Sequence, residues 1–399
     1  MNTTPVVWWP ESCDLASERI DFVSGSAGGN DLHVDEPVEL HSQIRQITSA
    51  PAITHNLYCE QPYCNESGNR VALFRTHDAC PTTPAQMLVY DINAYRVGRL
   101  AHDVLGIGAG IVATATVPWS GVIFTTQVQN SQMRLMRLDM DRLSSEVLFD
   151  WNPALGRGLF TISPDHSFGL ASAPTAETNN ESQSLLGIFR VDLSNGAHEL
   201  IHESLHISNP HLQVQMHEDQ RILVQENRID GGVGLYAIDR DGNCRRDFLI
   251  GPPYTPSTTG HQCWVGNSNR VLVTLSGSYN DGKRCGSVVE VGDTGMEPRV
   301  VFDSPHLWTH ISVSRCGRFF VTDCYQLPGV PLLIGSIATG KTATLCHAMT
   351  SGGGAQYSHA HAYFTGDTQH IVFNSDRTGL PQVYLATVPE GLLEILDRV

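Results

Sequence analysis

Short runs of β-branched and aromatic residues, each ended by Gly, Asn or Asp, recur along the chain. Hardly any stretch places apolar residues at i, i+3, i+4 and i+7, the spacing of an amphipathic helix. The repeating unit is a polar turn, an apolar strand, a variable polar gap and a second strand that carries an aromatic residue. Its clearest copies are residues 163–171 leading to 187–192, and residues 365–373 leading to 382–386. The pattern predicts an all-β protein.

Looser copies bring the number of units to seven, spaced by roughly 50 residues, which is a period typical of propeller repeats. We therefore predict a seven-bladed β-propeller, with four short strands in each blade around a central channel. Residues 38–47 are expected to supply a strand that closes the ring against the last blade. The predicted organisation is an N-terminal arm or loop over residues 1–36, followed by a single propeller domain over residues 37–399.

The composition is that of a folded protein, with 41% hydrophobic and 17% charged residues. The net charge of −16 argues against nucleic acid as a partner, because phosphate binding requires a positive surface. It also argues against a polyanionic substrate, unless a local positive group reverses the sign. The chain has no run of about 18 apolar residues and no signal-like start, so we expect no membrane contact and a cytoplasmic location.

One motif suggests a nucleotide site. Residues 335–342 match the GxxxxGK[ST] pattern, whose loop amides cradle phosphates in front of a helix. The residues that follow, 343–346, are too few and too rich in β-forming side chains for that helix. We therefore predict a hairpin with its turn at residues 339–341.

A group of histidines indicates a metal site. His359 and His361 stand at i and i+2 on one segment, so both imidazoles point to the same side, and Gln356 can add an amide oxygen. His310 stands at the matching place in the preceding blade, and equivalent positions on neighbouring blades converge at the channel mouth. Imidazole and amide ligands suit a divalent ion such as Mn²⁺. The alternative is a pair of surface histidines in a loop.

One blade earlier, His261 occupies the equivalent position. Beside a cation, a histidine outside the ligand set stays neutral and can act as a general base. The alternative is a structural histidine that bonds a loop carbonyl. The other blades start with residues 55–58, 156–158 and 210–213, two of which also supply histidines. Core packing alone does not account for histidine recurring at this position.

With these residues the chain resembles the oligogalacturonate lyase family, seven-bladed propellers that cleave oligogalacturonides by β-elimination with a bound divalent metal, typically manganese. The resemblance covers residues 38–390 and is strongest in the last blade, where Gln356, His359 and His361 match the family's Gln-x-x-His-x-His metal motif. His310 matches the third metal-binding histidine. His261, in a His-x-x-Trp setting, matches the histidine that serves as Brønsted base.

The resemblance implies a metal-dependent lyase that acts on an acidic oligosaccharide, with Mn²⁺ as the expected cofactor. A local divalent cation would also resolve the conflict between an acidic protein and an anionic substrate. The residues that start the remaining blades are then the candidate substrate-binding residues, namely His55, Tyr58, Arg157 and His211.

The chain departs from the family at two arginines. One aligns with Gly234, and the other ends a His-Pro-x-Tyr-Arg segment that aligns with residues 209–213, where this chain keeps the proline and has Gln213. Arginine forks bind carboxylates in a bidentate way, so the uronate that is recognised stays open. Arg157 and Arg228 are the candidate replacements.

Two other classes of function remain as alternatives. The first is a non-catalytic propeller that binds a protein or glycan, with histidines that hold a structural ion or none. Such a module needs no base, so the joint presence of His261 and the four-ligand set favours the lyase. The second is the propeller of a serine peptidase. The chain has no GxSxG motif and no stretch long enough for a hydrolase domain, and both observations argue against this alternative.

Overall fold

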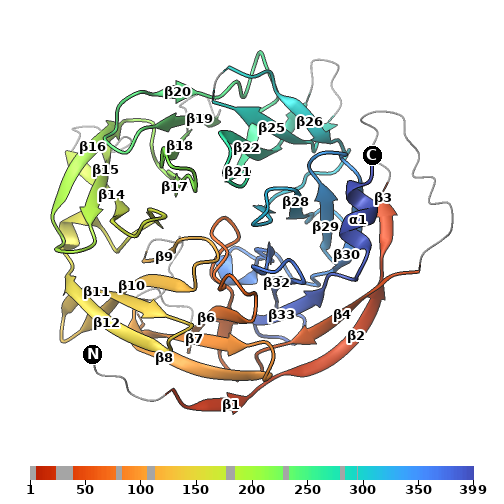
Figure 1. The fold of residues 1–399 in the computed structure, drawn as a ribbon, viewed down its shortest axis with the longest axis horizontal. Coiled ribbons are helices and arrows are strands. Elements are labelled where there is room, and N and C mark those ends of the chain that lie inside the picture. Colours follow the sequence, from red (N-terminus) through yellow and green to blue (C-terminus); the bar gives the residue numbers. More distant parts are fainter. Residues whose placement is uncertain are drawn as a thin grey trace.

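The computed structural model describes residues 6–23, 39–77, 83–105, 113–176, 185–227, 233–278, 284–293 and 295–399. Over these residues the chain forms seven antiparallel blades of four strands, arranged in a ring around a channel (Figure 1). The first strand of each blade lies beside the channel and the fourth lies at the rim. The predicted all-β fold and the seven-bladed β-propeller are confirmed.

The first four blades follow the chain in order. Their strands are β5 (Ile53–His55), β6 (Arg70–Thr76), β7 (Ala85–Asp91) and β8 (Arg96–Val104); β9 (Thr114–Thr116), β10 (Val122–Gln129), β11 (Gln132–Asp139) and β12 (Ser144–Asp150); β13 (Thr161–Ile162), β14 (Phe168–Ala176), β15 (Leu185–Asp192) and β16 (His198–Ser204); and β17 (Gln213–Val214), β18 (Ile222–Asn227), β19 (Val233–Ile238) and β20 (Arg246–Asp247).

Blade five also carries a small hairpin, and blade seven takes its outer strand from the N-terminal region. The strands are β21 (Thr258–Trp264), β22 (Arg270–Leu275), β25 (Val288–Gly292) and β26 (Arg299–Phe302), with the hairpin β23 (Gly277–Ser278) and β24 (Arg284–Cys285); β27 (Ile311–Val313), β28 (Phe319–Asp323), β29 (Pro331–Ser336) and β30 (Thr342–His347); and β31 (Tyr363–Phe364), β32 (His370–Ser375), β33 (Gln382–Thr387) and β4 (His41–Gln46).

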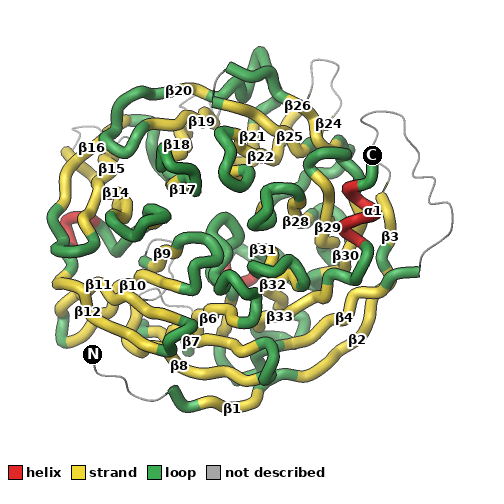
Figure 2. The backbone as a smooth tube through the Cα atoms, in the orientation of Figure 1, coloured by secondary structure: helices red, strands yellow, loops and turns green. Residues whose placement is uncertain are grey.

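Helical structure is limited to three short segments among the described residues: the 3₁₀ turns η1 (Pro153–Leu155) and η2 (Gln356–Ser358), and the helix α1 (Leu392–Asp397). Helix α1 lies at the outer side of the ring beside blade six (Figure 2). Within the part of the chain that the structure describes, no helix is long and apolar enough to cross a membrane.

The polar turn of the repeat joins the first and second strands of a blade. In blade three the Ser163 hydroxyl accepts the Phe168 N–H at 3.0 Å, and the Asp165 carboxylate accepts the Ser167 N–H at 3.0 Å. The turn in blade seven is held in the same way by a hydroxyl and a carboxylate two residues apart. The recurring hydroxyl-x-Asp pattern is therefore the signal that reverses the chain at the channel.

The core lies between the blades. Each blade packs one face on the blade before it and the other on the blade after it, so strands such as β6 are buried on both faces and read as nearly continuous apolar runs. The contact between blades three and four is typical, with Leu170 and Ile188 packed against Val224 and Tyr236.

The nucleotide-like motif is a hairpin, as predicted. Residues 337–341 turn the chain from β29 into β30, and no helix follows. Gly340 has a φ of +70°, and its N–H donates to the Ser336 carbonyl at 2.9 Å. The Gly340 amide therefore makes a hydrogen bond within the turn.

The ring is closed by a strand from the N-terminal region, as predicted. Strand β4 pairs with β33, and Ile44 stands opposite Ala386. Before it, β1 (Trp8–Pro10), β2 (Cys13–Arg19) and β3 (Asp21–Val23) add a further strand to blades one, seven and six. The described part of the expected arm or loop therefore follows the rim of three neighbouring blades (Figure 1).

A buried ion pair fastens this N-terminal segment to blade one. Arg75 donates to both carboxylate oxygens of Glu11, at 2.9 and 2.6 Å, and the two side chains are only 7% and 8% exposed. The Trp9 indole and the Ser49 N–H also donate to Glu11. Burial alone would raise the pKa of Glu11, but these hydrogen bonds and the charge of Arg75 outweigh it, and the pKa is lowered.

Replacing Glu11 should destabilise the fold, because it leaves the buried Arg75 cation without its partner. We expect Glu11→Ala to lower the free energy of unfolding by about 3 kcal/mol. Asp14→Ala is the matched control, since Asp14 pairs with Arg45 but is 75% exposed, and it should cost less than about 1 kcal/mol. Urea unfolding of both variants measures the difference, and equal losses would contradict a structural role for the pair.

The same pair predicts a pH dependence. The folded pKa of Glu11 lies below its unfolded value, so its contribution is complete above the unfolded pKa and is lost as the pH falls through the folded pKa. The gap in stability between wild type and Glu11→Ala should therefore narrow in acid.

Candidate metal centre and active site

The first strand of blade one is interrupted by a loop that enters the channel. Strand β5 pairs with one end of β6, and an isolated bridge resumes the pairing after residue 63. Residues 56–63, here called the channel loop, are buried throughout and lie near the centre of the ring (Figure 1). Asn56 ties the loop to blade seven, because its N–H donates to Asn374 Oδ1 and its side chain donates to the His361 carbonyl, both at 2.8 Å.

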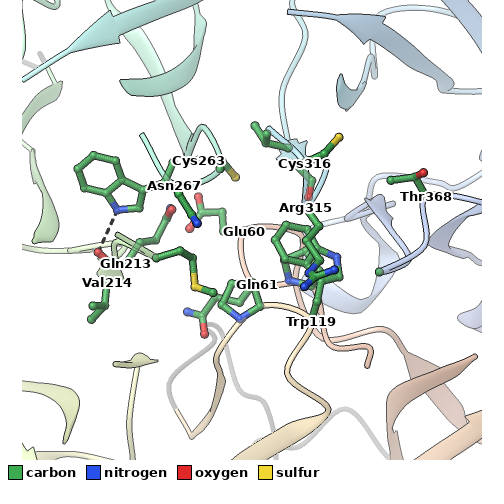
Figure 3. Close-up of a pocket in the computed structure, with 18 of the residues that line it drawn as sticks. Glu60, Gln61, Trp119, Gln213, Val214, Cys263, Asn267, Arg315, Cys316 and Thr368 are labelled. Atoms are coloured by element: carbon green, nitrogen blue, oxygen red, sulfur yellow. Dashed lines mark hydrogen bonds between the residues drawn. The ribbon is translucent and has the colours of Figure 1, made fainter. Parts of the chain in front are cut away.

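The channel loop lies between two cavities. The first, here called the histidine cavity, has a volume of about 480 Å³ and is lined by residues near the start of the first strands, among them His211 and His261. The second, of about 450 Å³, is lined by residues near the other end of these strands, such as Arg315 (Figure 3). Glu60 and Gln61 line both cavities, so the channel loop closes the floor of each.

Three histidines from blades six and seven converge beside the histidine cavity. His310 directly precedes β27, and His359 and His361 follow η2. One nitrogen from each ring lies within 4.8 Å of the others, close enough to bind a single ion. The expected convergence of equivalent positions on neighbouring blades therefore occurs for these three residues.

His310 is oriented by a buried carboxylate. Asp323, at the end of β28, is fully buried and accepts the His310 backbone N–H at 3.0 Å and the Nδ1–H at 2.9 Å. The Tyr325 hydroxyl donates to the same carboxylate at 3.3 Å and accepts the Ala360 N–H at 2.8 Å. With Nδ1 held in this way, Nε2 is the nitrogen of His310 that is left for a metal.

The other three predicted ligands carry buried polar atoms without a hydrogen-bond partner. His359 donates from Nε2 to the Gly353 carbonyl at 2.8 Å, which leaves Nδ1 unpartnered. Both ring nitrogens of His361 and Oε1 of Gln356 are also buried and unpartnered. Buried polar atoms are normally hydrogen-bonded, so this group fits a cation bound by imidazole nitrogens and an amide oxygen.

The surroundings favour the neutral, metal-binding form of His359 and His361. Burial, followed by the neighbouring His310 and His359, holds the pKa of His361 well below its usual value. Burial and His310 also lower the pKa of His359. A bound divalent ion would therefore have few protons to displace.

His261 lies next to this group, with its ring centroid 4.6 Å from that of His310. A chain of hydroxyls fixes its tautomer: Thr274 donates to the Thr309 carbonyl at 2.8 Å, so Thr274 must accept from Thr259, and Thr259 in turn accepts the His261 Nδ1–H at 3.0 Å. Nε2 of His261 therefore carries a free lone pair. Burial and the charges of His310 and His211 hold the pKa of His261 well below its usual value.

Two of the four candidate substrate-binding residues line the histidine cavity. The Tyr58 ring lies 4.5 Å from the His361 ring, and His211 pairs with Glu60. His55 does not line the cavity: its ring lies 5.2 Å from Phe74, and burial lowers its pKa to about 3.

Of the two candidate replacements for the missing arginines, the structure describes only Arg157. Arg157, which lies between η1 and β13, is not among the residues that line the histidine cavity. Arg228 lies outside the described residues. Gly234 is part of β19, and Gln213 donates to the Gln262 carbonyl at 2.7 Å and lines the second cavity.

Three polar residues of the site were missed by the sequence analysis. Glu60, Asp323 and Thr259 each bond an imidazole from a position that no local motif marks. A search for buried carboxylates next to β-strand ends could have indicated Asp323, because metal-binding histidines commonly donate to a carboxylate. Glu60 is 151 positions from its partner, so its role appears only in the fold.

Comparison with known proteins shows what this chain is similar to. A 175-residue segment is 28% identical to oligogalacturonate lyase from Dickeya dadantii (strain 3937), and it covers 40% of this chain and 44% of the relative. An oligogalacturonate lyase in complex with manganese superposes with a TM-score of 0.67 over 96% of this chain and 99% of that one, at 18% identity. A second, from Vibrio parahaemolyticus, gives 0.68 over the same fractions, at 16% identity.

The resemblance to oligogalacturonate lyases is confirmed. It extends over nearly the whole chain in fold, whereas the sequence match spans less than half of the curated relative. No family model matches the chain.

The geometry predicts that Asp323 controls metal affinity through His310. We expect Asp323→Asn to weaken Mn²⁺ binding by about 10–100-fold, since the amide no longer fixes the Nδ1–H tautomer with a negative charge. His361→Ala, which removes a ligand, should weaken binding further. Titration calorimetry measures both, with His198→Ala on the exposed strand β16 as the control. Wild-type affinity in Asp323→Asn would contradict the orienting role.

Proposed function

We propose that the protein is a metal-dependent lyase that cleaves oligogalacturonides, or a related uronate oligosaccharide, by β-elimination. The observation that carries the proposal is the combination of three converging histidines with His261, whose ring lies beside them and whose Nε2 carries a free lone pair. The fold it shares with an oligogalacturonate lyase in complex with manganese supports the same assignment. We propose in addition that the protein acts in the cytoplasm.

The proposed metal ligands are His310, Gln356, His359 and His361, and the proposed metal is Mn²⁺. The unpartnered atoms of Gln356, His359 and His361 match the ligand types that such an ion accepts. When bound, the cation would act as a Lewis acid towards the uronate carboxylate and spread the charge that develops during elimination. It would also supply the positive charge that the acidic chain lacks.

His261 is the proposed Brønsted base. The proton on C5 of a uronate is weakly acidic because the carbon is next to a carboxylate. Nε2 of His261 would take this proton, the C5–H electron pair would form the C4=C5 double bond, and the C4–O4 bond would break with its electrons on oxygen. Since the pKa of His261 lies well below its usual value, the imidazole is unprotonated at neutral pH.

The proposed substrate contacts come from the channel loop and blade four. Tyr58 and His211 line the histidine cavity, and the pKa of Tyr58 is raised well above its usual value by burial and by Glu60, so its hydroxyl stays a hydrogen-bond donor. His55 and Arg157 stay predictions as substrate-binding residues, since neither lines this cavity.

The proposed activity can be measured directly. Purified protein with oligogalacturonides and Mn²⁺ should produce an unsaturated product that absorbs in the ultraviolet, and a chelator should abolish the rise. Mn²⁺ binding without any product from oligogalacturonides or other uronate oligosaccharides would favour a non-catalytic propeller instead.

Loss of the base should reduce the rate without loss of the metal. We expect His261→Ala to lower kcat by about 10²–10⁴-fold, the usual contribution of a general base, while Mn²⁺ affinity stays near the wild-type value. Thr259→Val should lower kcat less, because it removes the hydrogen bond that fixes the tautomer of His261 but keeps the imidazole. An unchanged kcat in His261→Ala would refute its assignment as base.

A further inference from the structure

A buried acid and a histidine face each other in the channel. Glu60, on the channel loop, and His211, just before β17, have side chains that are 5% and 8% exposed. His211 Nδ1 lies 3.0 Å from both carboxylate oxygens of Glu60. A carboxylate taken this far out of water requires a partner of opposite charge or a strong donor, and His211 supplies it.

The pair leaves the other nitrogen of His211 facing outwards. Nε2 lies 2.8 Å from the side-chain amide of Asn209, which is exposed. An amide can present either its NH₂ or its oxygen, so Asn209 suits an imidazole that carries a proton on Nε2 and one that does not. His211 also has a φ of +42°, a strained conformation for this residue type that is typical of functional positions.

His211 faces the proposed base across the histidine cavity. The two ring centroids are 6.0 Å apart, and the Tyr58 ring lies 6.1 Å from His211 on the side of the metal group. His211 and His261 both line the cavity. A sugar ring bound in this cavity with its carboxylate towards the three histidines could therefore contact both imidazoles.

Building on the proposed function, we infer that His211 is the Brønsted acid of the elimination and that Glu60 is its positioning residue. As His261 takes the C5 proton and the C4–O4 bond breaks, the proton on His211 Nε2 passes to O4, and the leaving sugar departs as a neutral alcohol. Protons gained by His261 and lost by His211 are then exchanged with water, which restores both groups.

The charges around His211 support this role. Burial alone would lower the pKa of His211, but the charge of Glu60 and its hydrogen bond raise it above the usual value. The titratable groups that face His211 are Glu60 and Tyr58 from the channel loop and His261 from β21. The cavity thus holds, 6.0 Å from the ring of the proposed base, an imidazole whose raised pKa favours the protonated form that an acid requires.

The test compares two leaving groups. Cleavage of an oligogalacturonide needs a proton on O4, whereas elimination from a 4-deoxy-4-fluoro galacturonide releases fluoride, which leaves without one. We expect His211→Gln to lower kcat on the oligogalacturonide by about 10²–10⁴-fold and to lower fluoride release much less, because the variant loses a sugar contact in both reactions but a proton donor only in the first. His261→Ala should lower both, since both reactions need the base.

Glu60→Gln separates positioning from proton transfer. This variant keeps a hydrogen-bonding side chain but removes the charge that holds the proton on His211. The alkaline limb of its pH–rate profile should shift to lower pH, because activity is lost as the pH rises through the pKa of the acid. His202→Gln, on the outer strand β16 and bonded to Tyr236, is the matched histidine control. Melting temperature and Mn²⁺ affinity verify that each variant folds.

Each outcome of the comparison between the two substrates supports or overturns the assignment of His211. Equal losses on both substrates in His211→Gln would make His211 a residue that only positions the sugar and would overturn the assignment. A wild-type rate on the oligogalacturonide in His211→Gln would overturn it too. If the wild-type protein eliminates neither substrate, the proposed function fails and the inference with it, a result distinct from an active enzyme that tolerates His211→Gln.

Discussion

Closure of the ring is the constraint on which the site depends. A propeller blade contacts only its two neighbours, so residues from blades one, four, five, six and seven can meet in one cavity only if the first and last blades are joined. The antiparallel pairing of β4 with β33 makes this joint out of backbone hydrogen bonds. The buried Glu11–Arg75 pair secures the segment that leads into β4 at the same seam. Stability and chemistry are therefore linked through the N-terminal region, although none of the residues before β4 that the structure describes lines the histidine cavity.

The repeat explains how much of the site could be predicted from the sequence. The equivalent position in each blade brings His310 beside His359 and His361 once the blades are in order. His359 and His361 lie in the segment between η2 and β31, where His361 has a φ of +43°, so they converge without being in a strand. The same reasoning places His261 beside them. The same reasoning does not hold for the channel loop. This loop interrupts the first strand of blade one, so its residues have no equivalent positions in the other blades. His55 therefore packs beside Phe74, while Tyr58 enters the cavity.

The partners of the histidines could not be predicted for a different reason. Asp323 reaches His310 across the first two strands of a blade, and Glu60 reaches His211 across the channel. These contacts depend on the depth of the channel loop and on the tilt of the blades, which hydrophobic periodicity does not encode. Arg157, at the start of blade three, is not among the residues that line the histidine cavity, so its role in substrate binding stays a prediction.

The partners, rather than the histidines themselves, give each imidazole its role. His310 donates its Nδ1–H to a carboxylate, which leaves Nε2 as a strengthened ligand. His261 donates its Nδ1–H to a neutral hydroxyl chain, which fixes the same tautomer without adding negative charge, so the ring stays a weak, unprotonated base. His211 also faces a carboxylate, that of Glu60. Unlike His310, it is not part of the three-histidine group for which the cation is proposed. Identical side chains in and beside one cavity can thus take the proposed roles of ligand, base and acid, because the proton affinity of each ring depends on the group to which it is hydrogen-bonded.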